Sequence, residues 1–112
     1  MPYIKIQTNQ KVADKKAVLK KLSAVSAGAV GKPETYIMTA FDPETDMTFG
    51  GTDAPAAFIQ CKSIGLSGSQ TADISEALCS FCETELSVPQ DRVYIEFAGA
   101  AGNMWGWKGG TF

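Results

Sequence analysis

The chain has 112 residues, a length that predicts one domain over residues 1–112. Its formal net charge of −2 excludes the strongly basic surface that attracts nucleic acid or an anionic membrane. It contains no histidine, which removes the commonest general base and metal ligand and excludes every Ser-His or Cys-His nucleophile.

The N-terminal residues carry no predicted secretion signal. The sequence Met-Pro-Tyr-Ile-Lys has no apolar segment behind a basic start, and no apolar stretch approaches the roughly 20 residues that span a bilayer. We therefore expect a cytoplasmic protein, with any secretion by a non-classical route. Three cysteines, Cys61, Cys79 and Cys82, are an odd number that agrees with a reducing compartment.

The first half of the chain predicts a strand, a helix and a second strand. Residues 3–8 alternate apolar and polar side chains, as a half-buried strand does. Apolar residues recur at three- and four-residue spacing over residues 15–30 and predict a helix, whose clustered lysines are interpreted as a solvated face. Gly31 and Pro33 form a stop signal after it. Residues 35–41 are rich in β-branched and aromatic side chains and predict the second strand.

The second half repeats this order. After a turn over residues 42–46, residues 47–49 predict a short return strand, and residues 56–64 predict a main strand. A second helix is predicted over residues 70–87 and a fourth main strand over residues 92–98. The remaining residues form a tail rich in glycine and aromatic side chains.

Two successive β-α-β units predict an α+β fold, a four-stranded mixed sheet with both helices on one face. Pro33 and Pro89 each stand a few residues after a helix and shortly before a strand, which supports the repeat. The other face of the sheet is then bare. Because a bare face with apolar side chains has to be covered, the pattern predicts self-association.

Pro2 directly follows the initiator methionine and has two interpretations. It can simply start a strand, where its missing N–H costs nothing. Alternatively, a small second residue generally permits removal of Met1, which leaves a free secondary amine. A free α-amine has a reference pKa of about 7.7–8.0, and burial or a nearby lysine lowers it. Without histidine, this amine is the best candidate general base in the chain.

Short motifs recur along the whole chain in a specific order and spacing. They are Met1-Pro2, Gln7-Thr8-Asn9, Gly31-Lys32-Pro33 with Tyr36-Ile37, Met47-Thr48-Phe49-Gly50-Gly51, Ser63-Ile64-Gly65, Leu78-Cys79, Pro89-Gln90-Asp91-Arg92-Val93-Tyr94-Ile95, Gly106-Trp107 and Thr111-Phe112. Each is weak alone. Together they resemble the macrophage migration inhibitory factor (MIF) family of the tautomerase superfamily.

The resemblance implies a homotrimer in which three sheets wrap into a barrel-like core with the helices outside. It implies active sites at the subunit interfaces, each around a Pro2, and no cofactor or metal. The implied reaction is keto–enol tautomerisation of an aromatic α-keto acid such as phenylpyruvate, or of a dopachrome-like compound. The alternative is a cytokine-type or host-interaction protein with weak or vestigial tautomerase activity.

The resemblance also implies roles for particular residues. Pro2 would move the proton, Lys32 would hold the substrate carboxylate and keep the pKa of Pro2 low, and the backbone N–H of Ile64 would bind the substrate. The aromatic walls, some of them from the neighbouring subunit, would be Tyr36, Tyr94, Trp107 and Phe112. Taken alone, Lys32 could merely complement the helix dipole, and Tyr94 and Phe112 could be plain packing.

Several positions depart from the family pattern. Glu96 replaces the asparagine usual in the mammalian pocket, and Trp105 replaces a smaller aliphatic residue, so the substrate preference is left open. Cys79 and Cys82 have CxxC spacing but fall inside the second helix, which favours core packing over redox chemistry. For receptor binding, Glu44 resembles the acidic member of a pseudo-ELR pair, but the expected basic partner coincides with Val12, beside Lys11.

Overall fold

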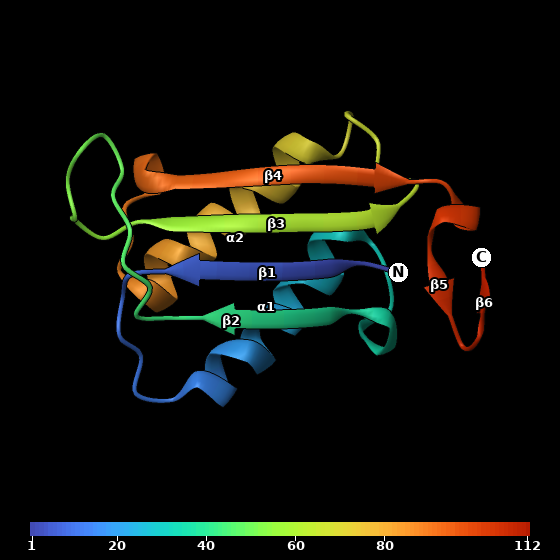
Figure 1. The fold of residues 1–112 in the computed structure, drawn as a ribbon, viewed down its shortest axis with the longest axis horizontal. Coiled ribbons are helices and arrows are strands. Elements are labelled where there is room, and N and C mark those ends of the chain that lie inside the picture. The colour runs from blue at the N-terminus through green and yellow to red at the C-terminus, as the bar shows by residue number, and fades with distance from the viewer.

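A computed structural model, which describes residues 1–112, consists of one four-stranded sheet with two helices packed against the same face (Figure 1). The helices are α1 (Lys15–Val30) and α2 (Thr71–Leu86). The main strands are β1 (Tyr3–Thr8), β2 (Met38–Asp42), β3 (Ala57–Ile64) and β4 (Val93–Ala100). The sheet order is β2-β1-β3-β4, with β1 parallel to β2, antiparallel to β3, and β3 parallel to β4. The predicted mixed sheet with both helices on one face is confirmed.

The two halves of the chain leave their helices in the same way. Helix α1 ends at Gly31 and α2 at Ser87, and both residues are left-handed, with φ of 70° and 55°. Pro33 and Pro89 then each precede a 3-10 turn, Glu34–Tyr36 or Gln90–Arg92, which leads into β2 or β4. The predicted strand over residues 35–41 therefore begins only at Met38, because the proline-initiated turn occupies the residues before it.

The core lies between the sheet and the helices. Alternate strand residues such as Ile4, Ile6 and Ile59 are fully buried against Leu22 of α1 and Leu78 of α2. This burial follows from the period-two alternation of a strand whose other face is open. Neither helix is long and apolar enough to cross a membrane.

Two irregular segments lie at opposite ends of the sheet. The predicted return strand over residues 47–49 is reduced to one bridge between Phe49 and Thr52, because Gly50 and Gly51, both with positive φ, make a two-residue turn there. The C-terminal tail forms a 3-10 turn (Gly102–Met104) and a small hairpin of β5 (Gly106–Trp107) and β6 (Gly110–Thr111). In Figure 1 this hairpin lies beside the N-terminus.

Candidate active site

Pro2 lies at the end of the sheet that faces the C-terminal hairpin. Its side chain is fully buried, and its carbonyl oxygen accepts a hydrogen bond of 3.0 Å from the backbone N–H of Met38. Tyr3, the next residue, begins β1 and pairs with Met38 in the sheet. The position of Pro2 is therefore fixed by the sheet itself.

Two cavities flank the N-terminus. One, of about 460 Å³, is mostly apolar and is lined by Met1, Pro2, Tyr3, Thr35, Tyr36, Ile37, Met38, Trp105, Gly106 and Trp107. The other, of about 420 Å³, is lined by Met1, Lys32, Pro33, Tyr36, Ile64 and Phe112. Met1 and Tyr36 belong to both linings, so the methionine lies where the two cavities meet.

The aromatic side chains at this end are exposed in the single chain. The rings of Trp107 and Phe112 stack at 5.5 Å between centroids with an interplanar angle of 17°. Tyr36, Trp107 and Phe112 remain 46%, 55% and 42% exposed. Exposed aromatic rings around a concave site are typical of a ligand pocket or of an interface.

Lys32 places a positive charge at this end of the sheet. Helix α1 stops at Gly31, and the backbone N–H groups of Gly31 and Lys32 both donate to the carbonyl of Ala27, which fixes the lysine just past the helix end. Burial lowers the pKa of the Met1 amine from its usual value of 8.0, and the charge of Lys32 lowers it further. An amine at this end is therefore biased toward its neutral, proton-accepting form.

Six of the nine predicted site residues line the two cavities around Met1, and Pro2 lines the larger of these cavities. The remaining two lie elsewhere. Tyr94 and Glu96 point to the open face of the sheet, where Tyr94 pairs with Phe58 and Phe58 with Gln7. Gln7 is four residues along β1 from Tyr3, or about 13 Å. Tyr94 is 64% exposed and lines a separate cavity of about 420 Å³.

Sequence reasoning missed other lining residues of the N-terminal cavities. Met38 is 65% exposed and lines the larger of the two, together with Thr35 and Ile37. The sequence contained a usable signal, because Met38 directly follows the Tyr36-Ile37 motif. The strand predicted over residues 35–41 did not indicate which of its side chains face the cavity.

Two of the three cysteines are buried in the core. Cys61 and Cys82 are fully buried, and burial raises the pKa of both thiols, that of Cys82 to about 12, with nearby Cys79 contributing. The interpretation of Cys82 as core packing is confirmed by its place in the core cluster. No group of three or more His, Cys, Asp or Glu side chains is arranged to hold a metal ion.

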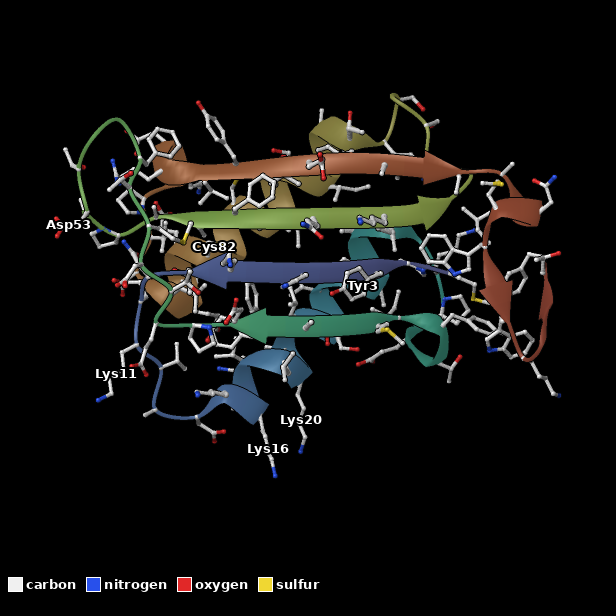
Figure 2. The ribbon with its side chains drawn as sticks, viewed as in Figure 1. Tyr3, Lys11, Lys16, Lys20, Asp53 and Cys82 are labelled. Carbon is white, nitrogen blue, oxygen red and sulfur yellow. The ribbon has the colours of Figure 1, made fainter.

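A third region lies at the opposite end of the sheet, where Figure 2 shows Lys11 and Asp53. A polar groove of about 650 Å³ there contains both Lys11 and Glu44 in its lining. The backbone N–H of Glu44 donates to the carbonyl of Gln10 at 3.1 Å, which holds the two segments together. The basic residue that shares this groove with Glu44 is therefore Lys11, and Val12 does not line it.

Two β-α-β units that share one sheet, with Pro2 beside a cavity lined by aromatic side chains, have the fold of the tautomerase superfamily. Residues 1–112 match the family model of Macrophage migration inhibitory factor (MIF), and the chain belongs to this family.

Relatives align over almost the whole chain. The Macrophage migration inhibitory factor homolog of Brugia malayi is 38% identical over all of this chain and 99% of its own length. The Macrophage migration inhibitory factor of Mus musculus is 35% identical over the same shares. Among solved structures, the homologue from Prochlorococcus marinus has a TM-score of 0.92 at 42% identity, covering 98% of each chain. That from Trichinella spiralis has a TM-score of 0.91 at 33% identity, covering 98% of this chain and 99% of its own.

Proposed function

We propose that the protein is a keto–enol tautomerase for phenylpyruvate-like aromatic α-keto acids, dopachrome-like compounds being the other candidate substrates. Its acid/base is the amine of Pro2, freed by removal of Met1. The observation that carries this proposal is the place of Met1 at the junction of the two cavities. Removal of Met1 turns the Pro2 amide into a basic amine and opens the junction to a substrate.

The lining residues support a simple proton transfer. Lys32 binds the substrate carboxylate and the backbone N–H of Ile64 binds a substrate oxygen, while the aromatic ring lies among Tyr36, Trp107 and Phe112. The neutral amine of Pro2 takes a proton from the carbon beside the carbonyl. The C–H electron pair forms the enol double bond, and the carbonyl oxygen takes up a proton from the Pro2 ammonium, which returns the amine to its neutral form. Lys32 stabilises the negative charge that develops on the way.

The open sheet face supports assembly as a homotrimer. Met38 and Tyr94 occupy the same position after the 3-10 turn in the two halves of the chain, and they are 65% and 64% exposed. A second copy that covers this face brings Tyr94 to the neighbour's Pro2 and completes the aromatic wall. Glu96, two residues further along β4, reaches the same interface and, with Trp105, adjusts which substrates bind.

Phenylpyruvate ketonisation, followed by the loss of enol absorbance, tests the proposal. Intact-mass measurement first establishes that Met1 is absent from the active protein. Pro2→Gly replaces the secondary amine of proline with a primary amine. In a form that retains Met1, the nitrogen of Pro2 is an amide and is not basic. Both are expected to lose at least tenfold in kcat/KM. Unchanged activity in both would falsify the role of Pro2.

We also infer a cytoplasmic location, which the three free thiols support. The groove that contains Lys11 and Glu44 favours a second function, a cytokine-type or host-interaction protein with vestigial turnover. Negligible turnover of every enolisable keto acid, together with specific partner binding that Lys11→Ala and Glu44→Ala abolish, is the result that favours this alternative over the enzyme.

A further inference from the structure

Arg92 holds the loop that enters β3. Its guanidinium group donates to four backbone carbonyls of this loop: Nε to Pro55 at 2.8 Å, Nη1 to Phe49 at 3.2 Å, and Nη2 to Thr52 at 3.4 Å and Ala54 at 3.0 Å. The planar fork of an arginine suits such a set of acceptors, and a lysine cannot reproduce it.

The same guanidinium group lies over an aromatic ring. The Cζ atom of Arg92 is 5.1 Å from the ring centroid of Phe49, within the range of a cation–π contact. The ring of Phe49 in turn lies 4.7 Å from the ring of Tyr94, at an interplanar angle of 42°. Arg92, Phe49 and Tyr94 therefore form one continuous chain of contacts that ends on an exposed phenol.

The loop geometry restricts Phe49 to this position. Phe49 and Thr52 exchange backbone hydrogen bonds of 2.9 and 3.2 Å around the turn of Gly50 and Gly51. Arg92 binds the carbonyls at both ends of that turn. It has no carboxylate partner, because the only salt bridge of the chain joins Lys21 to Glu85. Its charge is directed entirely to the loop and to the Phe49 ring.

We propose that Arg92 is a positioning residue that sets the preference of the enzyme for substrates with an aromatic ring. It acts by fixing Phe49 beneath Tyr94, and it does not touch the substrate. The inference rests on the proposed function, in which Tyr94 completes the aromatic wall of the neighbouring subunit's site. Contact with a fixed Phe49 keeps the Tyr94 ring in place when no substrate is bound. Binding an aromatic substrate then costs less side-chain entropy.

Two substrates, one with and one without an aromatic ring, distinguish a role in aromatic preference from a general effect on activity. Phenylpyruvate carries the ring, whereas pyruvate lacks it and is followed by exchange of its methyl protons for deuterium. Arg92→Met is expected to raise KM for phenylpyruvate about three- to tenfold with kcat within about twofold, and to leave pyruvate exchange within about twofold. Arg92→Lys is expected to behave in the same way. Phe49→Leu should reproduce the effect, and the double variant should add nothing to it.

Asn9→Ala is the matched control, because Asn9 binds the same loop and shares the Ala54 carbonyl with Arg92. Asn9 donates to the carbonyls of Asp53 and Ala54 and accepts from the N–H of Ala56, and none of these bonds involves Phe49. It is expected to leave the ratio of kcat/KM for the two substrates unchanged. Equal losses on both substrates in Arg92→Met, or a change in this ratio as large in Asn9→Ala, overturn the proposal.

A wild-type protein that turns over no keto acid contradicts the proposed function. The positioning role of Arg92 is then tested by nuclear magnetic resonance. Nuclear Overhauser contacts between the Phe49 and Tyr94 rings are expected in the wild type and are expected to disappear in Arg92→Met. Their persistence in the variant overturns the positioning role whether or not the protein is an enzyme.

Discussion

The backbone carbonyl of Pro2 accepts a hydrogen bond of 3.0 Å from the N–H of Met38, the first residue of β2. This contact continues the β1–β2 pairing to the very start of the chain, where most proteins fray. Pro2 is consequently held at the start of the sheet, beside Met1, which lines the Lys32 cavity. A general base needs such a position, because proton transfer requires heavy atoms within hydrogen-bond distance.

Replacing Lys32 with methionine should shift the pH profile of kcat/KM. Burial and the Lys32 charge both lower the pKa of the Met1 amine, and we expect the same two causes to act on a Pro2 amine freed by removal of Met1. In the proposed mechanism activity requires the neutral amine, so we expect activity to fall as pH drops through this lowered pKa. Lys32→Met removes one of the two causes, and its acid limb is expected at higher pH than that of the wild type.

The same variant is also expected to raise KM for phenylpyruvate about tenfold, because the carboxylate loses its cation. Lys20→Met is the control, since Lys20 is exposed and points away from the sheet (Figure 2). A profile that moves to lower pH in Lys32→Met, or moves equally in both variants, contradicts the electrostatic role of Lys32.

Most of the fold is predictable because its signals are local. The alternation in residues 3–8 and the three- and four-residue spacing in residues 15–30 each report one buried face, and the structure has strand and helix with these bounds. The strand predicted over residues 35–41 begins only at Met38, because the 3-10 turn that follows Pro33 occupies Glu34–Tyr36.

The site was less predictable because its residues come together only in three dimensions. Lys32, Ile64 and Phe112 are far apart in sequence, and the fold places them around one cavity. The family resemblance indicated them, whereas periodicity alone could not. The role of Tyr94 cannot be predicted from the single chain. Tyr94 lies on the open face of the sheet, and its role depends on which surface covers that face.

Substitutions at the two residues that end the helices, Gly31 and Ser87, should change the free energy of unfolding in opposite directions. Ser87 has a left-handed φ of 55°, so Ser87→Gly is expected to raise the free energy of unfolding by about 0.5–1 kcal/mol. Gly31→Ala is expected to lower it by about 1 kcal/mol. An added Cβ at Gly31 meets no atom within 4 Å, so the loss arises from the backbone alone. Urea unfolding at equal subunit concentration measures both, and a destabilised Ser87→Gly contradicts the assignment.

The contact between the helices and the sheet should dominate stability. Leu78 is fully buried in the core cluster, so Leu78→Ala is expected to cost about 2–5 kcal/mol through lost burial and a residual cavity. Glu76→Ala changes an exposed residue of the same helix and is expected to stay within about 0.5 kcal/mol of the wild type. Similar urea midpoints for the two variants contradict the observed burial of Leu78.

The thiols of Cys61 and Cys82 should be almost unreactive in the native protein. At pH 8, a thiol with a pKa of about 12 is ionised in only about one molecule in ten thousand, and Cys61 is fully buried as well. Iodoacetamide followed by mass spectrometry is expected to leave Cys61 and Cys82 unmodified under conditions that alkylate all three cysteines in urea. The protein should likewise fail to reduce insulin. Insulin reduction that disappears in Cys82→Ser is the result that restores a redox function for the Cys79–Cys82 pair.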